Sequence, residues 1–198
     1  MILSALLTLT LLGTDDAKQV ERPIQPVPNQ HELIERIVAT GGDAERVGKY
    51  IILVALRDAT DKDFELLKDL KAVKYLDCAH CKTDGTGLAN IAQMKRLEKL
   101  WLHDNKFVEK HLRHIRDLPR LRVLWLENTN VTDCGLHNVR KLESLQELYL
   151  ANTMVTDKSL HILVRLKKLR RIDIRNTKFT AVGIEELKER LPRVEVWH

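Results

Sequence analysis

An internal repeat is the feature that most constrains the fold of this chain. The stretch LRVLWLENTNVTD at 121–133 returns as LQELYLANTMVTD at 145–157, with its aliphatic residues at the same spacing. Seven columns of matching residues run through five consecutive units between positions 73 and 187, and in one unit they are Leu121, Leu124, Leu126, Thr129, Val131, Leu136 and Val139. The step from Leu121 to Leu145 is the period of every column, and a period of this length indicates stacked repeats, in which each unit buries its apolar side against its neighbours.

The hydrophobic spacing changes half-way through each unit. The pattern L-x-x-L-x-L alternates with a period of two, which is typical of a short strand. The second half, as in Leu136, Val139 and Leu142, has a spacing of three and indicates a helical segment. Thr-Asp pairs at 132–133 and 156–157 supply side-chain oxygens for the unpaired N–H groups at a helix start. Each unit is therefore predicted to form a strand, a turn, a capped helical segment and a return.

The first unit of the series is less regular than the others. Thr60-Asp61, Phe64 and Leu67 fall into their columns, but the strand at 51–56 fits two registers. Which side chains of this strand face the core is left open.

The pattern resembles the leucine-rich repeat family, through the stretches LRVLWLENTNVTDCGLHNV and LQELYLANTMVTDKSLHIL. These stretches are similar to the short subclass that carries V-T-D-x-G-L, which is known from cysteine-containing adaptor proteins and from exported bacterial proteins. The resemblance covers residues from about 50 to 198. It implies an α/β fold, a right-handed curved solenoid with parallel strands on the concave side and helices on the convex side. It also implies a non-catalytic binding scaffold.

Three units depart from the family's pattern in their convex turns. Asp84-Gly85, Val108-Glu109 and Thr180-Ala181 stand where Thr-Asp is expected. We expect these turns to be looser or to be capped differently.

The strand positions between the aliphatic columns point away from the core, so the fold does not dictate their identity. The position between the last two strand leucines holds, from unit to unit, Asp77, Trp101, Trp125, Tyr149 and Asp173. Neighbouring parallel strands lie about 4.8 Å apart. We therefore predict that the three rings form one solvent-facing ladder on the concave side, bounded by an acid at each end.

Two flanking rows complete the candidate surface. The row two residues before the ladder contributes Lys99, Glu147 and Arg171, and the row two residues after it contributes His103, Glu127 and Arg175. Exposed Trp and Tyr bury a large area at low entropic cost and are enriched in binding hot spots. The sequence therefore predicts a contact surface for a protein or peptide partner.

Two other interpretations of the surface remain open. The rings could shield one another and only stiffen the sheet through cross-strand pairing. Alternatively, the chain could be a structural or assembly adaptor that uses a basic convex face, on which we place Arg113, Arg116, Lys141, Arg165, Lys167 and Lys168.

The segment Cys78-Ala-His-Cys81 has the spacing of a redox or zinc motif. The repeat frame, however, puts Cys78 in a core column, and puts Cys81 in a column that elsewhere holds Asn105 or Thr129. Because the polar members of that column should serve the backbone of the turn, we interpret both cysteines as structural thiols.

The remaining motifs do not predict chemistry. His111 with His114, and His137 with His161, are weak metal signals that we interpret as solvated faces. The sequence has no G-x-S-x-G, H-E-x-x-H or phosphate-loop motif, and its net charge of +5 includes no long basic run. We therefore predict no enzyme activity, no cofactor, no metal centre and no nucleic-acid partner, and we expect a monomer.

The N-terminal region divides into three parts. Residues 1–17 begin with the apolar run ILSALLTLTLL and are expected to be a signal peptide, cleaved after Ala17. The alternative is that this run forms an N-terminal helix docked on the fold. A signal peptide would imply export into the periplasm or medium, and the alternative location is the cytoplasm. Residues 18–28 read as a linker with three prolines. Residues 29–48 are predicted to contain a capping helix that starts at Asn29 and stops at Gly41-Gly42.

The repeat domain with its C-terminal cap is assigned to residues 49–198. Leu191-Pro192 should end the last helix, and 194–196 should add an edge strand. Trp197 is expected to cover the open end of the core. No stretch of the sequence is apolar for long enough to predict a transmembrane helix.

Overall fold

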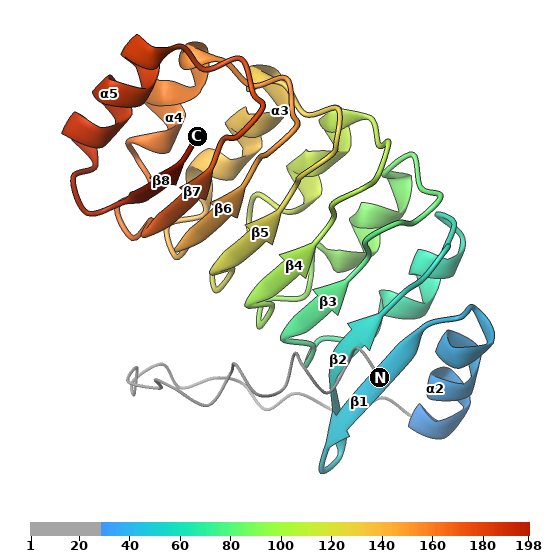
Figure 1. Cartoon of the computed structure of the whole chain (residues 1–198). Coiled ribbons are helices and arrows are strands. Elements are labelled where there is room, and N and C mark those ends of the chain that lie inside the picture. The colour runs from blue at the N-terminus through green and yellow to red at the C-terminus, as the bar shows by residue number, and fades with distance from the viewer. Residues whose placement is uncertain (1–28) are drawn as a thin grey trace.

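The computed structural model describes residues 29–198, so the expected signal peptide at 1–17 and the linker at 18–28 lie outside the described residues. The chain forms a curved stack in which the strands line one side and the helices the other (Figure 1). Within the described part, one sheet holds eight strands in chain order, and only the first pair is antiparallel. The solenoid with parallel strands on the concave side is thereby confirmed.

The strands are short and regularly spaced along the chain. They are β1 Asp43–Val47, β2 Tyr50–Ala55, β3 Tyr75–Asp77, β4 Lys99–Trp101, β5 Val123–Trp125, β6 Glu147–Tyr149, β7 Arg171–Asp173 and β8 Glu195–Trp197. Strands β3 to β8 pair in parallel with a step of one repeat, so that Leu100, for example, pairs with Leu124. This register places equivalent residues of successive units side by side.

The convex side carries α-helices and 3₁₀ helices (η). They are α2 Gln30–Ala39, η1 Asp63–Leu67, η2 Thr86–Ile91, η3 Glu109–His114, α3 Asp133–Leu136, η4 His137–Lys141, η5 Asp157–Ser159, α4 Leu160–Leu163 and α5 Ala181–Arg190. A 3₁₀ helix rises about 2.0 Å per residue against about 1.5 Å for an α-helix, so it spans the convex side with fewer residues. None of these helices is both long and apolar enough to cross a bilayer.

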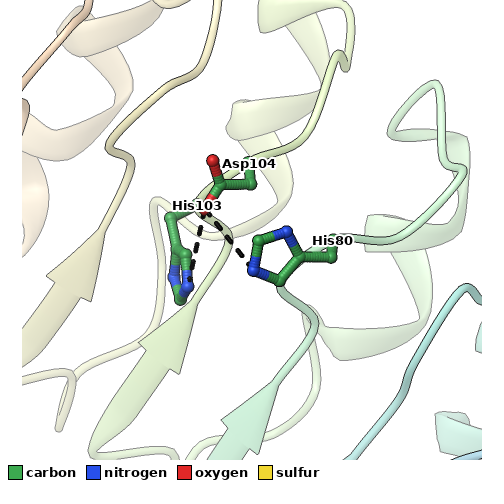
Figure 2. A group of neighbouring side chains, drawn as sticks. All are labelled: His80, His103 and Asp104. Carbon is green, nitrogen blue, oxygen red and sulfur yellow. Dashed lines mark ion pairs between the residues drawn. The ribbon is translucent and has the colours of Figure 1, made fainter.

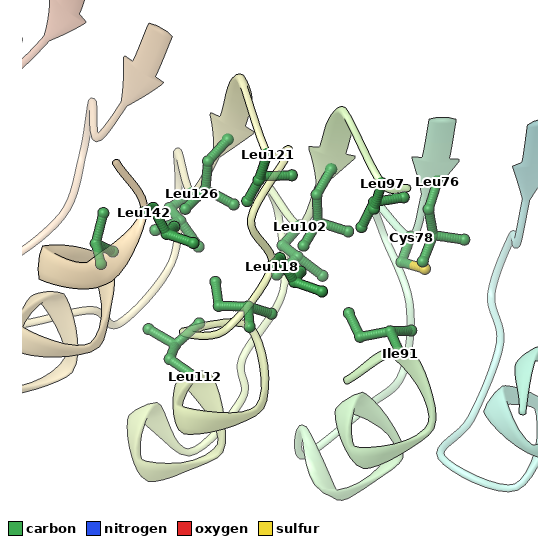
Figure 3. Packing of buried hydrophobic residues seen from close by; sticks show 14 of the residues in the cluster. Leu76, Cys78, Ile91, Leu97, Leu102, Leu112, Leu118, Leu121, Leu126 and Leu142 are labelled. Atoms are coloured by element: carbon green, nitrogen blue, oxygen red, sulfur yellow. The ribbon is translucent and has the colours of Figure 1, made fainter. Parts of the chain in front are cut away.

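The aliphatic columns form one continuous core between the strands and the helices. Leu121, Leu124, Leu126, Leu136 and Val139 are fully buried, and their equivalents in the neighbouring units are buried with them. Figure 3 shows Leu97 and Leu121 in equivalent positions of successive units, as are Leu102 and Leu126. Each buried aliphatic side chain contributes about 1.5–3 kcal/mol, so no unit is stable without its neighbours.

The polar column beside the core serves the turns, as predicted. Asn105 accepts a hydrogen bond from the backbone N–H of Cys81 (2.9 Å) and donates to the carbonyl of Cys78 (2.7 Å). Thr129 and Thr153 each donate to a carbonyl three residues earlier in their own unit. Buried backbone groups of the turns thus find partners.

The acids of the convex turns connect one unit to the next. Asp133 accepts hydrogen bonds from the backbone N–H (2.9 Å) and the hydroxyl (2.8 Å) of Thr156 in the following unit. Glu109 does the same for Thr132, and Asp157 for Thr180. The Thr hydroxyls cap their own helical segments, as predicted, while the acids cap the next one. The Thr180-Ala181 turn is therefore capped and not loose, whereas the helix that begins after Val108 has no side-chain cap.

His111 is buried, with 8% of its surface exposed, so its interpretation as part of a solvated face is wrong. It occupies the column that Gly135 and Gly183 hold in their units. The preceding unit has Gly85 at the position of the capping acid, with a φ of 97° that favours glycine. Because no acid side chain extends from Gly85, the imidazole of His111 packs in the space that a carboxylate fills elsewhere.

The first repeat strand adopts one of the two registers that the sequence left open. Val54 pairs with Leu76, so Val54 and Leu56 face the core while Leu53 and Ala55 lie on the concave side. The step from Val54 to Leu76 is shorter by two positions than the step from Leu76 to Leu100, which explains why the repeat period alone could not decide the register.

The N-terminal cap contains a helix, as predicted, and also a strand that was not predicted. Helix α2 ends at Ala39, and the N–H groups of Gly41 and Gly42 bond back to carbonyls of its last turn. Asn29 does not cap the helix through its side chain, because its backbone is left-handed and its amide donates to Glu32. Strand β1 pairs antiparallel with β2 and covers the edge of the parallel sheet.

The C-terminal cap follows the prediction except at Trp197. Helix α5 ends before Leu191-Pro192, and β8 adds the last parallel strand. Val196 pairs with Ile172, a core position, so the alternation of the strand turns Trp197 to the concave side. The expectation that Trp197 covers the core end is wrong; Val194 and Val196 pack there.

Candidate partner-binding face

The predicted aromatic ladder is present on the concave side. Strands β4, β5 and β6 place Trp101, Trp125 and Tyr149 in register. The ring centroids of Trp101 and Trp125 lie 5.0 Å apart with an interplanar angle of 10°, and those of Trp125 and Tyr149 lie 4.5 Å apart at 3°. The strand spacing thus stacks the three rings nearly face to face.

The ladder has a fourth ring that the sequence reasoning missed. Trp197 lies in the same row, and its ring meets that of Tyr149 edge-on at 6.1 Å and 62°. The signal was available, because Trp197 follows Asp173 by the same step that separates Asp173 from Tyr149. The guanidinium groups of Arg171 and Arg175 lie 5.3 and 5.5 Å from the centroid of Trp197, within the range of cation–π contact.

The expectation that the ring of Tyr149 faces solvent is wrong. Only 7% of its surface is exposed, because rings stand on both sides of it. Its hydroxyl donates a hydrogen bond of 2.7 Å to Glu147. Burial, together with this hydrogen bond, raises the pKa of Tyr149 to about 12. Trp101 and Trp125, by contrast, remain partly exposed.

The acids at the two ends of the predicted three-ring ladder, Asp77 and Asp173, each form an ion pair with an arginine of the same chain. Asp173 is fully buried, and both of its oxygens accept hydrogen bonds from Arg175, at 2.9 and 3.1 Å from Nε. Asp77 is half-buried and pairs with Arg57 at 2.7 Å. A fully buried carboxylate cannot contact a partner directly, so Asp173 is withdrawn from the contact surface.

The flanking residues near the C-terminal end form an interlocked network. Arg171 Nη1 lies 3.5 Å from a carboxylate oxygen of Glu147, and Arg171 Nε lies 3.1 Å from one of Glu195. Hydrogen bonding to Tyr149 and Glu195 raises the pKa of Arg171. We call the set Glu147, Tyr149, Arg171, Asp173, Arg175, Glu195 and Trp197 the C-terminal network.

The flanking residues in the middle of the face are less constrained. Lys99 lies with its Nζ 5.8 Å from the ring centroid of Tyr75. Burial and the charge of nearby Asp173 raise the pKa of Glu127. Burial lowers the pKa of His103, against the opposing effect of Asp104. We call the partly exposed set Lys99, Trp101, His103, Trp125 and Glu127 the open zone.

The structure gives Cys78 and Cys81 a packing role, as interpreted. Both thiols are buried and unbridged, and burial raises the pKa of Cys78 well above its usual value and that of Cys81 to about 11. The Cys81 sulfur contacts the carbonyls of Leu56 and Ala79 at 3.7 Å. Thiols held in the protonated form in this way are poor nucleophiles and poor metal ligands.

A hollow lies on the convex side, which is the side that the adaptor interpretation would use. A space of about 230 Å³ lies between His137, Arg140, His161, Ile162 and Arg165. Both histidines are exposed, as predicted.

Comparisons with known proteins bear on the fold. No protein-family model and no curated protein matches this sequence. Among solved structures, internalin C2 of Listeria monocytogenes strain 4b F2365 superposes with a TM-score of 0.57 at 17% identity, over 87% of this chain and 83% of that one. The fold is that of a leucine-rich repeat solenoid. A second internalin of the same strain, InlF, matches with a TM-score of 0.49 and 17% identity, and the match covers 67% of this chain but only 43% of that protein.

Proposed function

We propose that this chain is a non-catalytic scaffold that binds a protein or peptide partner through the open zone of its concave face. One observation carries the proposal: Trp101 and Trp125 stack at 5.0 Å while remaining partly exposed, at strand positions that the core does not use. Leucine-rich repeats can place any residue in this row, so two adjacent tryptophans are not required by the fold.

The surroundings of the tryptophan pair have the anatomy of a binding hot spot. Such a spot has an apolar aromatic centre and a polar rim. Lys99, His103 and Glu127 provide polar groups on both sides of the pair. The stacked rings lose little side-chain freedom on binding, because they are already ordered against each other.

The C-terminal network supports the pair from one side. Tyr149 stacks on Trp125 and is itself held by Glu147 and by Trp197. We infer that this end of the face acts mainly as a rigid backing, since its acids and arginines already pair with one another.

Affinity capture with matched baits tests the proposal. The wild-type chain and the variant Trp101→Ala/Trp125→Ala serve as baits for proteins of the producing organism, and the affinity of any protein captured by the wild type is then measured with both. Loss of two hot-spot residues, at about 2 kcal/mol or more each, predicts at least a hundredfold weaker binding. Thermal melts of both baits show whether the variant is folded.

Two further variants separate the faces. Lys99→Glu/Glu127→Lys changes the rim of the open zone without removing a ring, and should also weaken binding. Arg140→Glu/Arg165→Glu changes the convex hollow and should leave binding intact. If only the convex variant loses the partner, the adaptor function on the convex side replaces the one proposed here.

Export is part of the same proposal. The apolar run at 2–12 supports a signal peptide, and a scaffold that binds proteins could act in the periplasm or outside the cell. N-terminal sequencing of the chain recovered from its native host tests this directly. A mature protein that begins at Lys18 is expected, and retention of Met1 and the apolar run in the cytoplasm would contradict it.

A further inference from the structure

His80, His103 and Asp104 converge at the end of the concave strands. Asp104 Oδ2 lies 3.6 Å from His80 Nε2 and 3.8 Å from His103 Nε2. One ligand atom from each residue lies within 4.8 Å of the other two. Figure 2 shows the two imidazoles approaching Asp104 from the loops of two successive units, and the rings are nearly perpendicular, with centroids 5.4 Å apart.

The repeat brings these residues together. His80 and Asp104 occupy the same column, one residue before the Asn/Thr column, and both have left-handed backbone with φ of 55° and 56°. In the following units this column holds Asn128, Asn152 and Asn176. His103 directly precedes Asp104, so parallel stacking of two turns places one imidazole from each unit beside one carboxylate.

The neighbouring asparagines orient Asp104. The amide of Asn128 donates to Asp104 Oδ1 at 2.9 Å, and Asn152 donates to Asn128 at 2.7 Å. Asp104 Oδ1 is therefore engaged by the amide ladder, while Oδ2 is the oxygen that faces both imidazoles. A hydrogen bond that fixes a carboxylate in this way is typical of the outer shell of metal sites.

The donor set and the spacing fit a small divalent ion. Two imidazole nitrogens with one carboxylate oxygen are ligands of Zn²⁺ and related transition metals. In a tetrahedral zinc site with bonds of about 2.0–2.1 Å, ligand atoms lie about 3.3–3.4 Å apart. The separations of 3.6 and 3.8 Å need only small side-chain rotations to reach this value. His80 is exposed and can make such a rotation.

We propose that His80, His103 and Asp104 bind one divalent transition-metal ion of the Zn²⁺ class. Three protein ligands leave a coordination position for water at the surface of the concave face. The proposal goes beyond the partner-binding function proposed above, and the two sites share His103. Cys78 and Cys81, which frame His80 in the sequence, face the core and take no part.

Calorimetric titration of Zn²⁺ into the untagged chain tests the site. All variants carry Cys134→Ser, because Cys134 is an exposed free thiol that could bind Zn²⁺ by itself. The chain without further change should bind one equivalent. His80→Asn and Asp104→Asn should each weaken binding more than about tenfold, since loss of an outer-shell partner alone costs about 10–100-fold.

These two substitutions are designed to keep the fold. They place asparagine where the next three units already have it in the same left-handed turn. His137→Asn/His161→Asn is the matched control, because these two histidines are exposed on the other side of the molecule and should not matter.

Imidazole ¹⁵N spectra give a second readout. Zn²⁺ should shift the resonances of His80 and His103 and leave those of His137 and His161 in place. The proposal is overturned if the Cys134→Ser chain shows no saturable Zn²⁺ binding at micromolar concentration. It is also overturned if His80→Asn and Asp104→Asn retain the affinity, or if the control pair loses it.

Discussion

A carboxylate oxygen of Glu109 lies 2.7 Å from the point where the Cβ of any side chain at Gly135 would begin. The same oxygen accepts hydrogen bonds from the N–H groups of Thr132 (3.0 Å) and Gly135 (3.2 Å). The glycine of the V-T-D-x-G-L pattern therefore leaves room for the acid of the preceding unit. Where serine replaces this glycine, at Ser159, its hydroxyl donates to Asp133.

Gly135→Ala should accordingly destabilise the protein, although alanine is the better helix former by about 1 kcal/mol. The new methyl group forces Glu109 out of its hydrogen bonds, and overpacking of this kind costs about 1–3 kcal/mol. Denaturant unfolding of Gly135→Ala, Glu109→Ala and the double variant forms a cycle that measures the coupling. If the cost of Gly135→Ala is the same in the presence and absence of Glu109, the explanation is wrong.

Arg175→Ala should destabilise the protein, because it leaves a fully buried carboxylate, that of Asp173, without the guanidinium that binds both its oxygens. Arg170→Ala is the control, because Arg170 is exposed and directly precedes the same strand. The double variant Asp173→Ala/Arg175→Ala should recover part of the loss in denaturant unfolding. Equal stabilities of the Arg175→Ala and Arg170→Ala variants would contradict the assigned role.

The core and the ladder were predictable because they depend on periodicity alone. The repeat columns determine which side of each strand faces inward, and hence the common row of Trp101 and Trp125. The same period, followed for one more unit, places Trp197 in the ladder; the prediction went wrong by treating the chain end as a cap. The register at Val54 could not be predicted, because the step from Val54 to Leu76 falls two positions short of the period.

The environment of the predicted site residues was less predictable than their position. The sequence places Asp173 and Tyr149 on the concave side, but their burial depends on Arg175 and Trp197, which reach over them. His80 and Asp104 share a column that holds no aliphatic residue. Hydrophobic periodicity therefore does not predict that they lie close together. Side-chain partners across units, such as Asn128 with Asp104, depend on turn geometry that the pattern does not specify.

Trp125→Ala should destabilise the protein more than Trp101→Ala. Trp125 stacks on two rings, those of Trp101 and Tyr149, whereas Trp101 stacks only on Trp125 among the described residues. Each aromatic pair contributes about 0.5–1.5 kcal/mol beyond its buried area, so the difference should be about one such contribution. Denaturant unfolding of the two single variants measures it. The reverse order of stabilities would show that stacking does not hold the ladder together.

The protein should lose stability between pH 10 and 12 through Tyr149. The pKa of this hydroxyl is raised in the folded state from 10.0 to about 12, because it is buried and donates to Glu147. Its stabilising contribution is therefore fully present below pH 10. Above pH 10 the unfolded chain releases the proton more readily than the folded chain, so the free energy of unfolding falls as pH rises towards 12.

Tyr149→Phe tests this assignment, because it keeps the stacked ring and removes the titrating group. Denaturant unfolding of the wild type and the variant at several pH values should give a shallower alkaline decline for Tyr149→Phe. Tyr75→Phe is the comparison variant, because burial also raises the pKa of Tyr75. Tyr50, the remaining tyrosine of the chain, is unchanged in both variants. A direct titration of tyrosinate absorbance should show that the ionisation near pH 12 disappears in Tyr149→Phe. If the alkaline decline is unchanged in that variant, the hydrogen bond to Glu147 does not hold the proton on Tyr149, and the rigid backing assigned to this end of the ladder loses its main polar contact.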